Sequence, residues 1–131
     1  MHTVILSLLI LCLLPLTCAW TAGFYRQKQF GTVDNKEPRQ QSLQLTGAGA
    51  RAVAAQANTW EALGVYSAAI LAVFISGADL QSIGTPIMLF VALRVAYIFL
   101  YIGNMDKLRS LSFITGFGIC IYLFYIALST V

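Results

Sequence analysis

The sequence has very little charge for its length. Only 10% of its 131 residues are charged, whereas 59% are hydrophobic. A soluble domain carries roughly 25% charged residues, so this chain lacks the polar surface that contact with water requires. The length and the mean hydropathy of +0.79 predict a single domain that is surrounded by membrane lipid.

Signatures of metal, disulfide and phosphate sites are also missing. His2 is the only histidine and no CxxC or HExxH spacing occurs, so we expect no metal site. Cys12, Cys18 and Cys120 all fall inside apolar segments, which favours packing over a disulfide framework. The stretch GAGARA follows no strand, so it predicts close helix–helix contact and not a phosphate loop.

Lysine and arginine are absent from both ends of the chain and from the segment around residues 78–86. Basic residues gather in two other places, namely Arg26, Lys28, Lys36, Arg39 and Arg51, and then Lys107 and Arg109. Basic loops stay in the cytoplasm, so we expect both termini outside and these segments inside. This placement reports topology and gives no sign of nucleic-acid binding. Compact loops without a retrieval signal favour a bacterial inner membrane.

What the sequence does contain is long apolar segments. They cover about residues 4–25, 47–77, 83–104 and 108–130, and a polar loop covers about 26–46. A helix needs about 20 apolar residues to cross the hydrocarbon, and it satisfies its own backbone groups there. The sequence therefore predicts an all-α membrane protein, a bundle of four transmembrane helices.

The first segment allows one alternative. Thr17-Cys18-Ala19 loosely fits the small-residue rule for signal-peptide cleavage. The residues before the apolar stretch lack Lys and Arg, however, and cleavage after residue 19 would leave three helices. We therefore expect residues 1–19 to be kept, with their removal as the alternative.

Polar side chains interrupt the second predicted helix. At about 100° per residue, Arg51, Asn58 and Glu61 share one side over about 15 Å, while Gln56 points elsewhere. Glu61 is the only carboxylate within a predicted span. Such a stripe needs partners from another helix or from a ligand.

The third predicted helix carries a matching stripe, in which Tyr97 and Tyr101 follow Arg94 on the same face. A charge at mid-membrane costs about 2.5–3.5 kcal/mol, so we expect Arg94 to meet Glu61. Two interpretations stay open at this point. The pair is a structural ion pair that fixes helix register, or the surplus of polar groups marks a ligand pocket that opens to the cytoplasm.

Arg109 and Ser110 stand where the fourth helix begins, with Asp106 as the expected N-cap. A positive side chain, a hydroxyl and free helix N–H groups suit an anion. The alternative is an ordinary interfacial arginine beside a cap.

The combination of Asn58-x-x-Glu61, Arg94-x-x-Tyr97-x-x-x-Tyr101 and Arg109-Ser110 resembles the MAPEG family, the membrane-associated proteins of eicosanoid and glutathione metabolism. The resemblance covers the chain from about residue 26 onward. It implies a homotrimer in the membrane lipid, with glutathione as co-substrate between adjacent protomers near the cytoplasmic face.

The resemblance also implies roles for individual residues. Asn58 and Glu61 would hold the γ-glutamyl end, with Arg94, Tyr97 and Tyr101 lining the site. Arg109 and Ser110 would stabilise the thiolate, and Arg26, Lys28 and Arg51 would meet the carboxylates. Many members have the motif R-A-H-x-N-x-x-E, whereas this chain has Ala54 in place of its arginine and Gln56 in place of its histidine.

The implied function is a glutathione transferase or peroxidase that acts on lipophilic electrophiles or lipid hydroperoxides. One alternative is a non-catalytic membrane binding or assembly protein that uses the same pocket. Another is a small proton-coupled exporter, although such exporters place their carboxylate in the first helix, where this chain has none.

Overall fold

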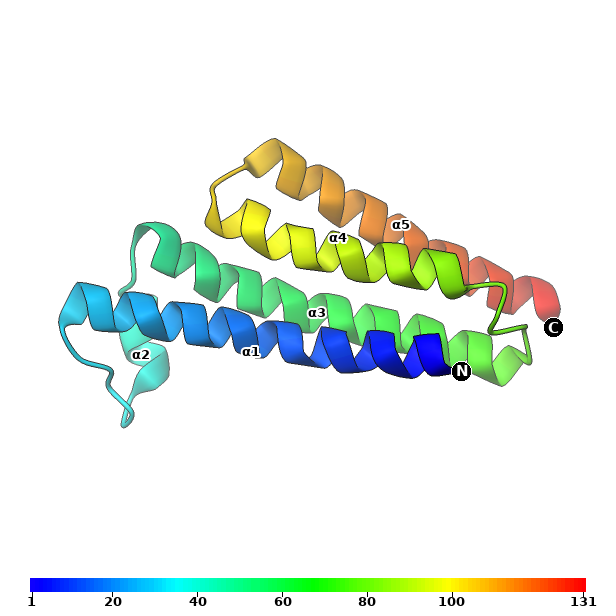
Figure 1. Cartoon of the computed structure of the whole chain (residues 1–131), viewed down its shortest axis with the longest axis horizontal. Coiled ribbons are helices and arrows are strands. Elements are labelled where there is room, and N and C mark those ends of the chain that lie inside the picture. The colour runs from blue at the N-terminus through cyan, green and yellow to red at the C-terminus, as the bar shows by residue number, and fades with distance from the viewer.

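The computed structural model describes all 131 residues, which form five helices and no strand. The helices are α1 (His2–Phe30), α2 (Pro38–Leu43), α3 (Gly47–Ser76), α4 (Gly84–Ile102) and α5 (Asp106–Thr130) (Figure 1). All except the short α2 are long and apolar enough to cross a membrane. The all-α bundle of four long helices is as the sequence predicts.

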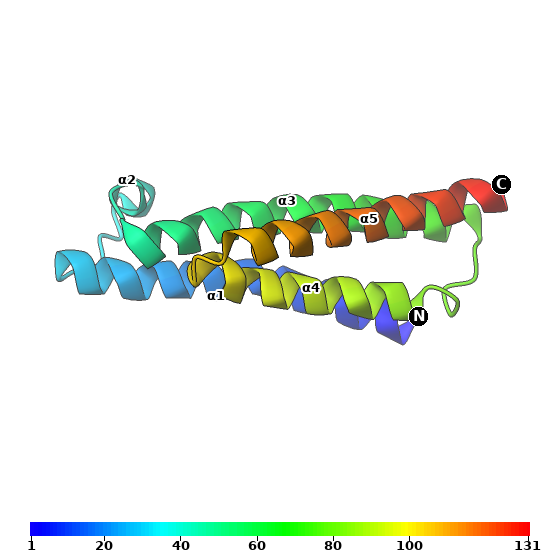
Figure 2. The ribbon, with the colours of Figure 1, turned by 90° about the horizontal axis from the view of Figure 1, so that it is seen from above.

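The four long helices run antiparallel to their sequence neighbours (Figure 1). Seen from above, α1 and α4 form one row and α3 and α5 the other (Figure 2). Helix α3 contacts α1, α4 and α5, whereas α1 and α5 do not contact each other. Both termini lie at one end of the bundle, and α2 and the α4–α5 turn lie at the other (Figure 1). The second end carries the basic residues, and we call it the basic end.

Helix α1 is longer than the apolar segment that predicts it. The polar loop expected from residue 26 begins only after Phe30. Residues such as Gln27 and Lys28 are good helix formers, so the helix continues beyond its apolar part. It ends where Gly31 adopts φ 75 and donates its N–H to the Gln27 carbonyl, the left-handed termination that glycine accepts without strain. Arg26 and Lys28 are therefore helical, and α2 occupies part of the expected loop.

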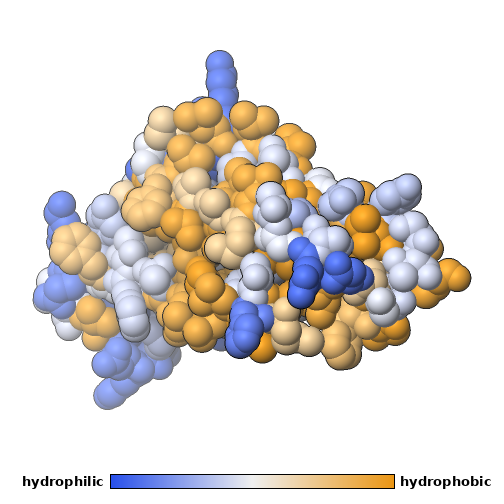
Figure 3. All heavy atoms as spheres, turned by 45° about the vertical axis from the view of Figure 1, so that its right-hand side comes forward, coloured by the Kyte–Doolittle hydropathy of each residue, from blue (hydrophilic) through white to orange (hydrophobic).

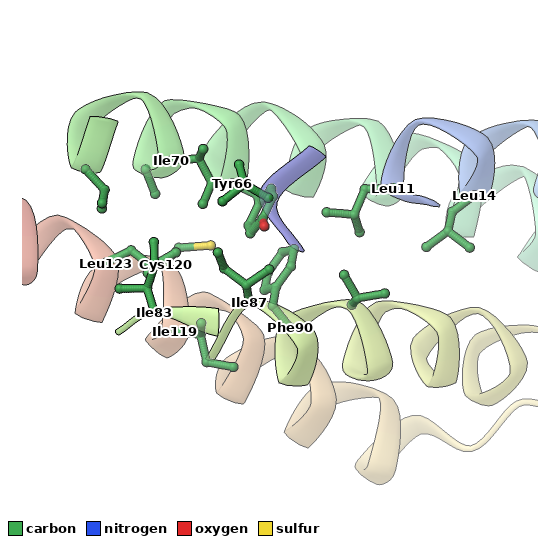
Figure 4. Close-up of a cluster of buried hydrophobic side chains, with 14 of the residues drawn as sticks. Leu11, Leu14, Tyr66, Ile70, Ile83, Ile87, Phe90, Ile119, Cys120 and Leu123 are labelled. Atoms are coloured by element: carbon green, nitrogen blue, oxygen red, sulfur yellow. The ribbon is translucent and has the colours of Figure 1, made fainter. Parts of the chain in front are cut away.

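The main cluster of buried hydrophobic side chains takes residues from all four long helices (Figure 4). Tyr66 of α3 stacks on Phe90 of α4, with ring centroids 4.6 Å apart and planes 8° apart. The Tyr66 hydroxyl lies 2.6 Å from the hydroxyl of Ser7, which itself donates to the Val4 carbonyl. Because Ser7 has only one proton, Tyr66 is the donor to Ser7. This satisfies both buried hydroxyls.

The outer faces of the bundle are apolar. Trp20, Phe24, Phe74 and Leu128 are among the large hydrophobic side chains that are mostly exposed. Apolar residues cover much of the visible surface, with hydrophilic residues in separate groups (Figure 3). A surface of this kind matches acyl chains and does not match water.

Close packing of α1 against α3 depends on Gly49, in the GAGARA segment. A Cβ atom at this position would lie 2.8 Å from the Tyr25 Cβ and 3.0 Å from Leu45 Cδ2. Real Cβ atoms do not approach so closely, so the two helices can meet here only because residue 49 has no side chain.

We predict that Gly49→Ala lowers the free energy of unfolding by about 1–3 kcal/mol, the usual cost of overpacking. Unfolding in mixed detergent–dodecyl sulfate micelles, followed by circular dichroism, measures it. Gly118→Ala is the control, because nothing lies within 4 Å of a Cβ there. Equal stability of the two variants would contradict this account of the α1–α3 contact.

Candidate functional site

Arg94 is the only charged side chain in the interior of the bundle. It is 2% exposed, and its Nη2 donates to Asn58 Oδ1 at 3.0 Å and to Thr59 Oγ1 at 3.3 Å. Its guanidinium carbon lies 4.2 Å from the centre of the Tyr97 ring, a favourable cation–π distance. Its Nε atom is buried without a partner. Arg94 therefore has spare donor capacity in a low-dielectric site.

The expected ion pair between Arg94 and Glu61 is wrong. Asn58 stands between the two groups, since its Oδ1 accepts from Arg94 and its Nδ2 lies 3.4 Å from Glu61 Oε2. The reason is helix rotation. Asn58 and Thr59 face α4 closely enough to reach the guanidinium, whereas Glu61 lies on the exposed side of α3.

A polar hollow of about 440 Å3 opens at the basic end between α3, α4 and α5. Its lining includes five predicted site residues and two apolar ones: Asn58, Tyr97, Tyr101, Arg109, Ser110, Phe113 and Ile114. Tyr97 and Tyr101 meet edge to face at 5.5 Å. The structure thus brings together residues from three separate helices around one space.

Arg109 is held over the Tyr101 ring, with its guanidinium carbon 4.4 Å from the ring centre. Asp106 is not the N-cap as expected, because Met105 has that position and Asp106 is the first helical residue. The Arg109 N–H already donates to the Met105 carbonyl at 2.9 Å. The free N–H groups at the start of α5 belong to residues 106–108, none of which lines the polar hollow, so an anion there would meet the side chains of Arg109 and Ser110.

A second, apolar hollow of about 220 Å3 adjoins the first. Its nine lining residues are Glu61, Ala62, Val65, Phe90, Arg94, Phe113, Gly116, Phe117 and Cys120. Phe113 belongs to both hollows. Glu61 and Arg94 therefore face one common space, although they do not pair directly.

The other basic residues that were predicted to belong to the site do not line the polar hollow. Arg51 Nε donates to the Ile102 carbonyl at 2.9 Å, which ties the start of α3 to the last residue of α4 and places a cation at the negative end of that helix. Arg51 does not line the polar hollow. Lys28 is exposed near the end of α1.

Arg26 lines a third hollow, of about 570 Å3, on another side of the molecule. This hollow lies between α1, α2 and α3 and also contains Arg39, Gln56 and Trp60. Gln56 is two residues before Asn58 and so points about 160° away around α3. A single chain therefore does not bring Arg26 to Arg109.

The site residues of the three sequence motifs can now be compared with known protein families. The sequence model of the MAPEG family matches residues 3–129. The chain belongs to the MAPEG family. Neither a curated protein nor a solved structure matches the chain. The family match includes α1, beyond the residues from 26 onward that carried the resemblance, and with four candidate spans it makes this chain an integral membrane protein.

Sequence reasoning missed two residues of this candidate site. Thr59 is buried and accepts from Arg94, and its spacing from Ala52 and Ala55 marks the buried face of α3. Phe113, the wall shared by the two hollows, follows Ser110 by three residues on α5. The periodicity of the helices was a sufficient signal for both.

We predict that Arg94→Met leaves the free energy of unfolding unchanged or raises it by ~1 kcal/mol or more. A buried charge with an unpaired Nε costs desolvation, and an apolar replacement of similar length removes that cost. Unfolding in mixed micelles measures the change. A loss of about 3–5 kcal/mol, the expected result of breaking a structural ion pair, would contradict this account and favour a purely structural Arg94.

Proposed function

We propose that this MAPEG protein is a glutathione-dependent membrane transferase or peroxidase that conjugates or reduces lipophilic electrophiles or lipid hydroperoxides. The observation that carries the proposal is the polar hollow, in which Arg109 and Ser110 stand opposite Asn58 and the two tyrosines. A hollow with a cation and hydroxyls at one end of an apolar bundle suits a small anion more than a lipid chain.

The chemistry needs a thiolate, because only the ionised sulfur of glutathione is a strong nucleophile. A free thiol has a pKa of about 8.5. In the proposal, the Arg109 guanidinium lies beside the sulfur and lowers the pKa of the thiol toward neutrality. The Tyr101 ring keeps that guanidinium in place, and the Ser110 hydroxyl donates to the sulfur.

The other groups of glutathione have matching partners. Its ammonium meets Glu61, which is exposed and bonded only to Asn58 among the side chains. One carboxylate meets the unsatisfied Nε of Arg94 or the Tyr97 and Tyr101 hydroxyls. Arg26 and Lys28, from a neighbouring protomer, meet the other carboxylate.

Two features support a homotrimer. The hollow around Arg26 and the one around Arg109 lie at the same end but on different sides of α3, so a site that uses both needs a second copy of the chain. Glu61 is also exposed on a membrane helix, where contact with acyl chains is costly. Small residues surround it on that face, namely Ala50, Ala54, Ala57, Gly64 and Ala68, and they allow close helix contact.

The positive-inside rule places the basic end in the cytoplasm. In this orientation the polar hollow opens toward soluble glutathione, and both termini lie outside. The compact loops favour a bacterial inner membrane.

A second candidate function is a non-catalytic binding or assembly protein. It is favoured by Ala54 and Gln56, which replace the arginine and histidine of many family members. Gln56 also faces the Arg26 hollow instead of the thiol site. Such a protein would hold glutathione or a lipid without ionising a thiol.

We predict that glutathione added to the purified protein raises the ultraviolet thiolate absorbance near neutral pH. Arg109→Ala should reduce this signal at least tenfold, because the guanidinium that stabilises the thiolate is gone. Ser110→Ala should reduce it a few-fold. Lys107→Ala is the matched control, since Lys107 is exposed on the same helix and lines none of the described hollows.

Two outcomes would change the assignment. Saturating glutathione binding without thiolate absorbance would establish the non-catalytic candidate. An equal signal in Arg109→Ala and in Lys107→Ala would show that another group ionises the thiol.

A further inference from the structure

We propose that the hollow around Arg26, between α1, α2 and α3 at the basic end, binds the phosphate headgroup of an anionic phospholipid from the cytoplasmic leaflet. The acyl chains of that lipid would follow the apolar part of the same hollow toward the membrane interior. This inference goes beyond the proposed function, because it concerns a different hollow and a different ligand. Lipid binding can be measured without glutathione, so the two proposals can fail independently.

The charge that lines this hollow is entirely positive. Arg26 comes from α1 and Arg39 from α2, and no acidic residue lines the hollow. The Arg26 Nη1 donates to the Pro38 carbonyl at 3.4 Å, whereas its Nε is buried without a partner. Guanidinium groups bind phosphate oxygens through paired N–H donors. Two of them in a hollow without a carboxylate therefore form a site for a phosphate group.

The hollow changes from polar to apolar along the helices. On α1, Arg26 follows Ala19 by seven residues, which is about 10 Å of helix. Helix α3 runs in the opposite direction (Figure 1), so Val53 lies at the basic end and Trp60 lies deeper. The half-buried amide of Gln56 lies between them. A phospholipid has the same order, namely a phosphate, ester carbonyls that accept hydrogen bonds, and apolar chains.

The deeper end of the hollow continues into the lipid-facing surface. Trp60 lines the hollow and is 49% exposed, and Leu43 of α2 also lines it and is 76% exposed. The hollow measures about 570 Å3, which holds a headgroup while the acyl chains extend along the exposed face. A soluble anion would gain nothing from these apolar side chains, whereas an acyl chain would bury surface against them. The shape therefore favours a lipid over a free anion.

The position of the hollow matches the place where anionic lipid is found. The positive-inside rule puts the basic end in the cytoplasm, and anionic headgroups of the cytoplasmic leaflet attract basic residues near the membrane. Because no carboxylate lines the hollow, the ammonium of a zwitterionic headgroup has no partner there. A guanidinium has five N–H donors, so Arg26 can contact the lipid phosphate and still donate to glutathione of a neighbouring protomer.

The test measures which lipid lies against Trp60. Trp20 and Trp60 are the only tryptophans, so Trp20→Phe leaves Trp60 as the single reporter. This protein is reconstituted without glutathione into vesicles of phosphatidylcholine and phosphatidylglycerol, in which one of the two lipids carries bromine on its acyl chains. Bromine quenches tryptophan fluorescence on contact, so the quenching gives the relative association constant of each lipid. We expect phosphatidylglycerol to bind roughly fivefold more strongly than phosphatidylcholine.

Arg39→Gln, added to the Trp20→Phe protein, should bring the ratio of the two association constants close to one. Arg39 is exposed, so this change leaves the core intact. Lys36→Gln is the matched control, since it removes the same charge from the exposed segment before α2 and does not line the hollow. Its ratio should stay at the value of the Trp20→Phe protein.

Three results would overturn the proposal. The first is equal association of both lipids at Trp60 in the Trp20→Phe protein. The second is an equal loss of preference in Arg39→Gln and Lys36→Gln, which would show attraction to the charged surface and not to the hollow. The third is loss of the preference in millimolar inorganic phosphate at constant ionic strength, which would show a site for soluble anions.

Discussion

A buried guanidinium with no carboxylate beside it is the constraint on which the rest of the structure depends. Arg94 lies within an apolar bundle. Its guanidinium contacts only neutral groups, namely the Asn58 amide, the Thr59 hydroxyl and the Tyr97 ring. Neutral partners of this kind lower the desolvation cost but leave the charge uncompensated. The Nε of Arg94 keeps a free hydrogen-bond donor, and the proposed function uses this donor to bind an anionic guest.

The interior of the bundle combines a packed core with two hollows that the candidate site residues line. Toward the termini, the stacked Tyr66 and Phe90 and the hydroxyl of Ser7 make a closely packed core. At the basic end, α3, α4 and α5 enclose the polar hollow, and the apolar hollow extends from it inward as far as Phe90 and Cys120 of the core. Phe90 belongs both to the packed core and to the wall of the apolar hollow, so the packing of the core holds that wall in position. The polar and apolar hollows share Phe113 as a wall, so groups bound in the two hollows would lie next to each other there.

Much of this arrangement could be predicted from the sequence. Apolar length identifies the four spans, because lipid imposes a fixed thickness on a helix. The spacing of Arg94, Tyr97 and Tyr101 identifies a shared polar face on α4, because side-chain direction repeats with the helical period. What the sequence could not supply is the rotation of one helix against another, which packing decides. That rotation places Asn58 between Arg94 and Glu61 and directs Arg26 to a different side of the molecule.

The central claim is that polar side chains from separate helices of the trimer together hold glutathione. Native mass spectrometry of the protein released from detergent, with and without glutathione, tests it most directly because it reports assembly and ligand stoichiometry in one spectrum. Our account predicts that glutathione stays bound to trimers, up to one molecule per chain, and is absent from monomers. Monomers that carry glutathione as fully as trimers do, or trimers that carry none at saturating concentration, would contradict it.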